Sequence, residues 1–206
     1  MAVSAVNPLH AGEPLETARV AVVMLHGRGS SAEDILSLSA ELETPGVAFL
    51  APEAPGGTWY PQRFIVPVAQ NEPWLGAALE TVRSAIADTN LAQHQVALLG
   101  FSQGACLALE TALRVGGRFK AVIGFSGGLI GADEELGARA GANLHGTPIF
   151  LGCSDVDFHI PLSRVKQSAA LLEVHGAQVD ARIYPNFGHT INPDELEAAR
   201  HLLQLP

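Results

Sequence analysis

The sequence predicts an α/β fold with a mostly parallel, doubly wound sheet and helices on both faces. Short apolar runs rich in β-branched residues recur along the chain, and segments with helical spacing lie between them. The runs are apolar on successive residues rather than on alternate ones, which is typical of parallel strands buried on both faces. The chain has 206 residues, 48% hydrophobic and 16% charged, which suits one well-packed domain over residues 1–206.

Six apolar runs are predicted to be strands. Residues 1–18 are less regular, and we expect one or two antiparallel edge strands there. The predicted strands are Val20–Leu25, Val47–Ala51, Val96–Gly100, Ala121–Phe125, Ile149–Gly152 and Ala181–Tyr184.

The helices between these strands have recognisable beginnings and apolar faces. Residues 31–34, Ser-Ala-Glu-Asp, form a capping-box-like opening before an apolar stretch that starts at Ile35. Asn192-Pro193-Asp194-Glu195 provides an N-cap, a proline at the first helical position and an acid at the third. The other predicted helices are Trp74–Leu91, Gln103–Val115 and Leu162–His175.

Two long loops, Glu53–Pro73 and Gly127–Pro148, begin directly after predicted strands. They therefore start at the carboxyl edge of the sheet, where open α/β folds bind their ligands. The second loop carries no long insertion of the kind that forms a lid domain in many lipases. We expect a fold without a lid domain and a pocket open to small esters.

Charge and composition exclude several classes of function. Lys and Arg number 12 against 21 Asp and Glu, for a formal charge of −9 without basic clusters, so a nucleic-acid partner is not expected. No apolar run approaches the ~20 residues of a membrane span, and the first residues do not have the pattern of a signal peptide. Cys106 and Cys153 lie in apolar segments and are expected to be reduced thiols. These features predict a cytoplasmic enzyme or binding protein.

The turn after the first predicted long strand has two interpretations. Residues 27–32, Gly-Arg-Gly-Ser-Ser-Ala, satisfy the G-x-G-x-x-[GA] pattern of dinucleotide-binding folds, and Glu53 follows roughly 20 residues later. The alternative is that the glycines expose backbone N–H groups to a transient oxyanion. The two interpretations differ in what they expect downstream, since only the second requires a nucleophile, an acid and a base.

A candidate nucleophile lies between the third predicted long strand and the helix after it. Residues 100–104, Gly-Phe-Ser-Gln-Gly, match the G-x-S-x-G turn that lifts a serine hydroxyl above the sheet. The flanking glycines allow strand and helix to approach closely. Ser102 is therefore the predicted nucleophile.

A serine needs a base and an acid that orients the base, and in this fold they follow in the order Ser, Asp or Glu, His. His189 lies after the last strand and before the last helix, and is the predicted base. Asp155 and Asp157 both follow the fifth strand; Asp157, deeper in the turn, is preferred, with Asp155 as an acceptor for loop N–H groups. His159 is a weaker candidate base. The backbone N–H groups of Arg28 and Gln103 are the predicted oxyanion donors.

These residues lie in motifs that resemble a known family. In order, the motifs are LHGRG, APEAP, GTWYP, GFSQGA, FSGGL, DVDFHIP and FGHT, covering roughly residues 20–190. The chain resembles the serine carboxylesterase and acyl-protein-thioesterase-like, or phospholipase/carboxylesterase, branch of the α/β-hydrolases. The resemblance implies an α/β-hydrolase fold with Ser102 as nucleophile, Asp157 as acid, His189 as base and Arg28 and Gln103 as oxyanion donors.

The substrate side departs from the family pattern. Thioesterase relatives often carry W-[FY]-D where this chain has residues 59–61, Trp-Tyr-Pro, and SG-x-LP where it has residues 126–131, Ser-Gly-Gly-Leu-Ile-Gly. Substrate preference is therefore not carried over. The candidate pocket residues either line an acyl or alcohol pocket or pack the loop down: Trp59, Tyr60, Phe64 and Ile65.

The expected function is hydrolysis of short- to medium-chain carboxylic esters through an acyl-enzyme, without a cofactor or metal, by a monomer or homodimer. An acyl thioesterase or lysophospholipase would need the same three residues and a different pocket. A non-catalytic binding protein on a hydrolase scaffold is a remote alternative. Arg28 is expected to act through its backbone alone, so Arg28→Ala should leave turnover largely intact.

Overall fold

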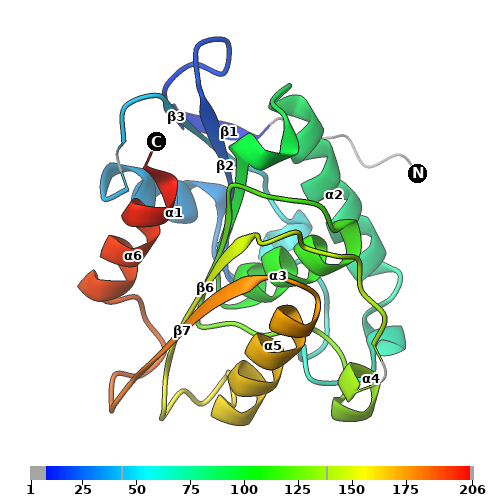
Figure 1. Cartoon of the computed structure of the whole chain (residues 1–206). Coiled ribbons are helices and arrows are strands. Elements are labelled where there is room, and N and C mark those ends of the chain that lie inside the picture. The colour runs from blue at the N-terminus through cyan, green and yellow to red at the C-terminus, as the bar shows by residue number, and fades with distance from the viewer. Residues whose placement is uncertain (1–7, 43, 138, 205–206) are drawn as a thin grey trace.

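A seven-stranded sheet forms the centre of the computed structural model, which describes residues 8–42, 44–137 and 139–204 (Figure 1). The strand order is β1-β3-β2-β4-β5-β6-β7. β1 runs antiparallel to β3, and all other neighbours are parallel. The strands are β1 Leu9–Gly12, β2 Val20–Leu25, β3 Val47–Ala51, β4 Val96–Phe101, β5 Ala121–Phe125, β6 Pro148–Ser154 and β7 Gln178–Tyr184.

The predicted strands are all present, and the differences concern their ends. The edge strand expected within residues 1–18 is β1; residues 1–7 lie outside the described residues. β7 begins three residues earlier than predicted, at Gln178, because this edge strand is polar along its exposed part and its apolar run covers only its end. The predicted parallel, doubly wound α/β sheet is confirmed.

The helices lie in two layers. Helices α1 and α6 cover one face of the sheet and α2, α3 and α5 the other (Figure 1). The helices are α1 Ala32–Leu36, α2 Trp74–Asp88, α3 Gln103–Val115, α4 Asp133–Gly137, α5 Leu162–Val174 and α6 Pro193–Leu203. Short 3₁₀ helices span Ser37–Ala40, Pro55–Gly57, Val68–Asn71 and Gln93–Gln95. An apolar core lies between each helix layer and the sheet, so the central strands are buried on both faces.

The predicted helix starts are capped as the sequence suggests. The Ser31 side chain accepts a hydrogen bond from the N–H of Asp34. At α6, Asn192 and Glu195 form a capping box, with distances of 3.0 Å and 2.8 Å between the bonded atoms. This cap fixes the start of α6 four residues after His189, and so limits where the preceding loop can lie.

The parallel topology brings distant segments to one edge of the sheet. β2, β4, β6 and β7 all end there, so the turns that follow them are neighbours although they lie far apart in the sequence. Between β5 and β6, the described residues form only the five-residue helix α4, and no lid domain is seen. In the described part of the chain, no helix is long and apolar enough to cross a membrane.

Candidate active site

Ser102 occupies a strained turn between β4 and α3. Its backbone φ is 55° and ψ is −116°, and its N–H donates to the Phe125 carbonyl over 2.9 Å. A Cβ atom at Gly104 would overlap the Leu25 carbonyl oxygen, and one at Gly100 would overlap the backbone of Gly104. Only glycine therefore allows α3 to lie this close to the sheet, and this close approach holds Ser102 in its unusual conformation at the carboxyl edge.

Ser102, His189 and Asp157 form a continuous chain of hydrogen bonds. Ser102 Oγ lies 2.9 Å from His189 Nε2, and His189 Nδ1 lies 2.6 Å from Asp157 Oδ2. Because Nδ1 faces a carboxylate, it carries the proton, and Nε2 is left to accept the proton of the serine hydroxyl. This geometry allows a proton to pass from serine to imidazole when the oxygen attacks an electrophile.

Asp157 is held as a carboxylate by three donors. Burial acts to raise its pKa, but the hydrogen bond from His189 and the N–H groups of His159 and Ile160 lower the pKa, and the net pKa lies below the usual value. The two N–H groups reach Oδ1 over 2.8 Å and 3.0 Å. An ionised carboxylate in this position can orient the imidazole and stabilise it when it becomes positively charged.

Asp155, the alternative candidate for the acid, binds the backbone of the loop after β7 instead of the His189 ring. Its Oδ1 accepts from the Asn186 N–H over 2.8 Å, and its own N–H donates to the Tyr184 carbonyl over 3.1 Å. The structure therefore brings Asp157 and not Asp155 to the His189 ring. Asp155 ties the loop to nearby backbone, as expected of the aspartate outside the hydrogen-bonded chain.

The imidazole of His189 is flanked by two rings. The Phe101 ring centroid lies 4.9 Å from that of His189, and the His159 centroid lies 4.8 Å away. His159 was the weaker candidate for the base; its side chain is exposed beside His189, and its backbone N–H binds Asp157. Its contribution in this structure is to support the acid and to border the imidazole.

The glycine-rich turn after β2 lies against Ser102. A Cβ atom on Gly27 would meet the Ser102 Cβ at 3.5 Å. Among the contacts of the described residues, the N–H groups of Arg28 and Gln103 donate no hydrogen bond, and both flank this point. Two free backbone donors beside a nucleophile can bind an oxyanion that forms on the substrate.

The start of α1 is already occupied, which disfavours a phosphate there. Glu53 Oε2 accepts from the Ala32 N–H at the first turn of this helix over 2.6 Å. In a dinucleotide-binding fold the pyrophosphate takes that place and the acid binds a ribose. Glu53 therefore caps a helix here, and the cofactor interpretation of residues 27–32 loses its acid.

Two buried side chains, His26 and Trp59, hold the glycine-rich turn in place. His26 has no exposed surface: its Nδ1 lies 2.8 Å from the Gly27 carbonyl, and its Nε2 accepts from the Ala54 N–H over 3.1 Å. Trp59 Nε1 donates to the His26 carbonyl over 2.9 Å. The signal in the sequence for His26 was its position directly before the glycine-rich turn, within the motif LHGRG.

Gln103 also links two parts of the site. Its side-chain Oε1 accepts from the Trp59 N–H over 3.0 Å, and its Nε2 donates to the Tyr60 carbonyl over 2.8 Å. The residue that offers a backbone N–H to the candidate oxyanion site thus anchors the first long loop through its side chain. These two bonds hold the first long loop against the turn that carries Ser102.

The candidate pocket residues are mostly buried. Trp59 is 2% exposed, Tyr60 1% and Phe64 7%, and all three pack in the main apolar core; Ile65 is partly buried against it. Of the two interpretations left open, the structure favours loop packing for the three aromatic residues. The apolar surface of these aromatic rings is covered by the core, and their contact with a substrate stays a prediction.

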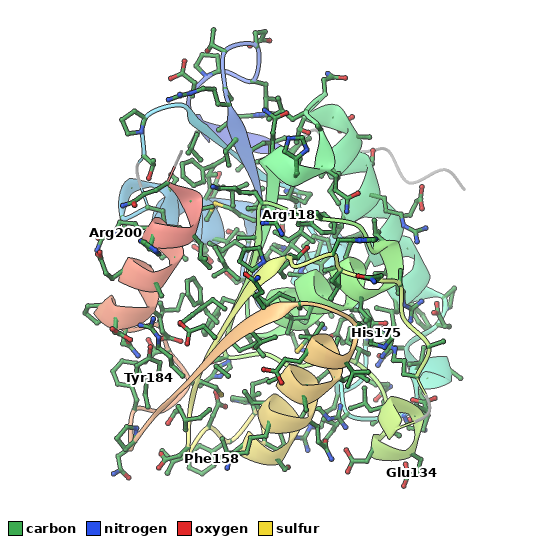
Figure 2. The ribbon with its side chains drawn as sticks, in the orientation of Figure 1. Arg118, Glu134, Phe158, His175, Tyr184 and Arg200 are labelled. Atoms are coloured by element: carbon green, nitrogen blue, oxygen red, sulfur yellow. The ribbon has the colours of Figure 1, made fainter. Side chains whose placement is uncertain are left out.

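Exposed apolar side chains lie instead on the loops that carry Asp157 and His189. Val156 and Phe158 flank Asp157 and are 44% and 92% exposed, and Phe187, two residues before His189, is 39% exposed. Figure 2 shows Phe158 at the lower edge of the molecule, on the segment that joins β6 to α5.

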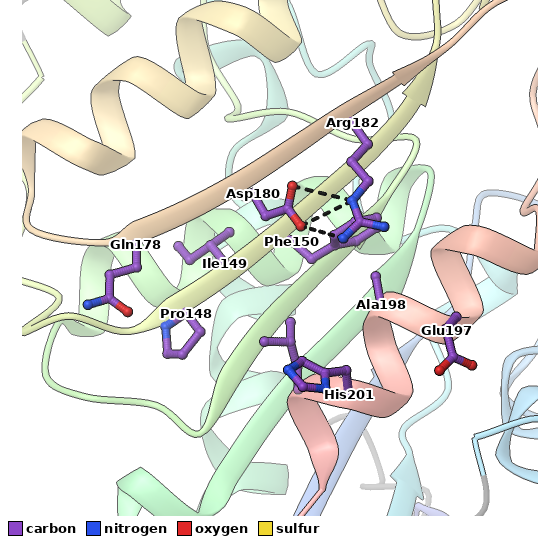
Figure 3. Close-up of a pocket in the computed structure, with 10 residues that line it drawn as sticks. Pro148, Ile149, Phe150, Gln178, Asp180, Arg182, Glu197, Ala198 and His201 are labelled. Atoms are coloured by element: carbon purple, nitrogen blue, oxygen red, sulfur yellow. Dashed lines mark hydrogen bonds and ion pairs between the residues drawn. The ribbon is translucent and has the colours of Figure 1, made fainter.

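A hollow of about 330 Å³ lies away from these residues, between β7 and α6 (Figure 3). Arg182 there is paired with Asp180 and Asp194 and lies over the Phe150 ring, 5.5 Å from its centroid. The charge of Arg182 is thus already paired. The hollow includes none of the residues predicted for the site. The lining residues are Pro148, Ile149, Phe150, Gln178, Asp180, Arg182, Glu197, Ala198, His201 and Leu202.

The two cysteines are free and buried, as expected. The pKa of each thiol is raised to about 12, chiefly by burial and, at Cys153, also by the neighbouring Asp157. A thiol in such a setting stays protonated and is a poor nucleophile. Within the residues described, no group of three or more His, Cys, Asp or Glu side chains is placed to hold a metal ion.

The Arg28 side chain has a role that was not expected. Its guanidinium donates to the carbonyls of Tyr60, Pro61 and Gln62 over 2.8–2.9 Å. We expect Arg28→Ala to lower Tm by about 3–6 °C through the loss of these bonds. Turnover should stay within about tenfold of the parent protein, because the backbone N–H remains. Differential scanning calorimetry and ester hydrolysis measure the two effects.

Arg63→Ala is the matched control, because Arg63 is an exposed arginine of the same loop that makes none of these side-chain bonds. Its Tm should equal that of the parent protein. A loss of turnover in Arg28→Ala as large as that of Ser102→Ala would show that the side chain itself takes part in the reaction.

Comparison with known proteins supports the fold and assigns the family. The family model described as Phospholipase/Carboxylesterase matches residues 11–205. The structure of a phospholipase/carboxylesterase from Dyadobacter fermentans DSM 18053 is similar with a TM-score of 0.91 and 38% identity, covering 98% of this chain and 99% of that one.

Two acyl-protein thioesterase 1 sequences are also similar. That of Saccharomyces cerevisiae is 26% identical over 218 residues, covering 93% of this chain and 94% of that protein. That of Gibberella zeae is 30% identical over 123 residues, which are 58% of this chain and only 52% of that protein. On the family match and the fold, the chain belongs to the phospholipase/carboxylesterase family of α/β-hydrolases.

Proposed function

We propose that this protein hydrolyses carboxylic esters of short to medium chain length through a Ser-His-Asp acyl-enzyme mechanism. The observation that carries the proposal is the unbroken hydrogen-bonded chain from Ser102 Oγ through His189 to Asp157, at distances of 2.9 Å and 2.6 Å. The family match supports hydrolysis as the reaction class. The three residues meet the geometric requirements of a nucleophile, a base and an orienting acid.

The first half of the reaction forms the acyl-enzyme. Ser102 Oγ attacks the carbonyl carbon of the ester while His189 Nε2 takes the hydroxyl proton, and Asp157 stabilises the imidazolium. The carbonyl oxygen becomes an oxyanion that accepts hydrogen bonds from the N–H groups of Arg28 and Gln103. When the intermediate collapses, the bond to the alcohol oxygen breaks and the alcohol leaves with the proton from His189.

The second half releases the acid. His189 takes a proton from a water molecule, whose oxygen attacks the acyl carbon and forms a second tetrahedral intermediate. The same two N–H groups bind its oxyanion. The bond to Ser102 Oγ then breaks, and the serine recovers its proton from His189. No cofactor takes part in this cycle: the Ser102 proton leaves with the alcohol, and a proton from water restores the Ser102 hydroxyl.

A thioesterase or lysophospholipase is the second candidate. The acyl-protein thioesterase relatives favour it, since a thioester carbonyl is open to the same attack. We place the simple ester first because the described residues between β5 and β6 form no lid domain, which suits a small, dissolved ester. The proposed partner is a small-molecule ester, and the proposed state in solution is a monomer or homodimer in the cytoplasm.

A substrate series tests this proposal. p-Nitrophenyl esters from acetate to palmitate are assayed beside a thioester and a lysolipid of matched acyl chain. We expect the largest kcat/KM at the short to medium esters, and covalent labelling of Ser102 by an organophosphonate, located by peptide mass spectrometry. A larger kcat/KM for the thioester or lysolipid would select the second candidate. Folded protein that neither hydrolyses an ester nor takes the label would support a non-catalytic binding protein.

A further inference from the structure

The hydroxyl of Ser154 joins the two loops that carry Asp157 and His189. Ser154 is the last residue of β6 and is 2% exposed. Its Oγ lies 3.2 Å from the Val156 N–H nitrogen and 3.2 Å and 3.0 Å from those of Phe187 and Gly188. Val156 directly precedes the acid and Gly188 directly precedes the base. One buried oxygen thus binds the backbone next to both residues.

The position of this oxygen follows from the end of the sheet. Ser154 and Tyr184 are the last paired residues of β6 and β7, so beyond them the two segments are no longer joined by the hydrogen bonds of the sheet ladder. The loop after β7 also contains two residues with positive φ, Asn186 at 54° and Gly188 at 84°, and so turns its N–H groups back toward β6. Side-chain acceptors replace the missing backbone partners there, Ser154 for two of these N–H groups and Asp155 for a third.

We propose that Ser154 is a positioning residue, whose hydroxyl oxygen fixes the distance between the Asp157 loop and the His189 loop and so keeps His189 Nε2 in line with Ser102 Oγ. It touches neither the substrate nor the reacting atoms. This inference rests on the proposed function, because its effect is exerted through the His189 imidazole. It adds to that function a residue outside the nucleophile, base, acid and oxyanion donors.

The expected consequence is kinetic. The imidazole must meet a carboxylate at 2.6 Å and a hydroxyl at 2.9 Å at the same time. A displacement on the order of 1 Å in such an arrangement costs about 100-fold in rate. Without the Ser154 oxygen, the N–H groups of residues 187 and 188 lose their partner and are free to turn toward solvent. The His189 loop then samples positions in which the imidazole no longer spans both partners.

Ser154→Ala tests the inference, with Ser154→Thr as the variant that keeps the oxygen. We expect Ser154→Ala to lower kcat about 10- to 100-fold with KM within about twofold, since the substrate pocket is untouched. The rate of Ser102 labelling by the organophosphonate and the rate of deacylation should fall by the same factor, because both steps use His189. Ser154→Thr should recover most of kcat. Labelling stoichiometry at long times counts the folded active sites, so a folding defect is separated from a slower reaction.

Ser163→Ala is the matched control, because Ser163 is an exposed serine on α5 that makes no side-chain hydrogen bond among the described residues. Rates in Ser154→Ala equal to those of Ser163→Ala would overturn the inference while leaving the proposed function intact. So would a rise in KM with kcat unchanged, which would place the effect in substrate binding. If the parent protein is not labelled at Ser102, the proposed function itself fails, and the two results are distinguishable.

Discussion

Replacement of Ser102 by alanine is expected to lower kcat about 10⁶-fold, the size seen when a nucleophile of this kind is removed. The methyl group cannot attack a carbonyl carbon, and the thiols of Cys106 and Cys153 are poor replacements, because both are buried and their pKa values are raised to about 12. What remains is the catalysis that a general base and two oxyanion donors give to direct attack by water.

The assay compares Ser102→Ala with the parent protein on p-nitrophenyl butyrate, after passage over a fresh column so that traces of parent enzyme are excluded. Ser163→Ala, the control used for Ser154, should keep the parent rate. Circular dichroism checks the fold, since alanine at a position with φ of 55° is as strained as serine. Turnover in Ser102→Ala within tenfold of the parent would remove Ser102 as the nucleophile.

The second large effect is expected at Asp157. Asp157→Asn should lower kcat about 10⁴-fold, as in other proteins with this arrangement, because an amide cannot hold the Nδ1 proton of His189 in place. The amide NH₂ would instead donate to Nδ1 and favour the other tautomer of His189. Nε2 would then carry the ring proton and could not accept the hydroxyl proton of Ser102. KM should change little, since the carboxylate has no side-chain exposure.

Asp155→Asn provides the matched comparison, since the two aspartates are two residues apart and the change is the same. Its amide oxygen can still accept from the Asn186 N–H, which the carboxylate now binds over 2.8 Å. Turnover should therefore stay within about tenfold of the parent protein. Steady-state kinetics on one ester with both variants decides the assignment, and the reverse order of effects would make Asp155 the acid.

The strands and helix starts were predictable because they depend on residues that are close together in the sequence. The buried strands are apolar on successive residues, and the caps at Ser31 and Asn192 need only residues within one turn of each other. The elbow at Ser102 was also predictable, since its glycines are required by a close approach of strand and helix that any such turn imposes. The start of β7 was missed because its polar, exposed half carries no apolar run.

The order of Ser102, the aspartate pair and His189 determined the candidate residues, but not their contacts. Which aspartate meets His189 depends on how the β6 and β7 loops leave the sheet, and both aspartates follow the same strand. The Trp59 and Tyr60 pair shows the same limit. An aromatic pair in a loop predicts that the rings are buried, but only the packing of residues 53–73 onto the main apolar core identifies the surface that buries them.

By itself, then, the sequence determined the sheet, the elbow, the order of the candidate residues and the family, because each of these depends on neighbouring residues or on spacing along the chain. Only the tertiary structure decided the rest. It placed Asp157 rather than Asp155 on the imidazole, gave Arg28 a side-chain role and bound the N–H groups of Phe187 and Gly188 to Ser154. Those contacts join segments about 30 residues or more apart, and they arise because parallel strands end at one edge, a property of the assembled sheet rather than of any one segment.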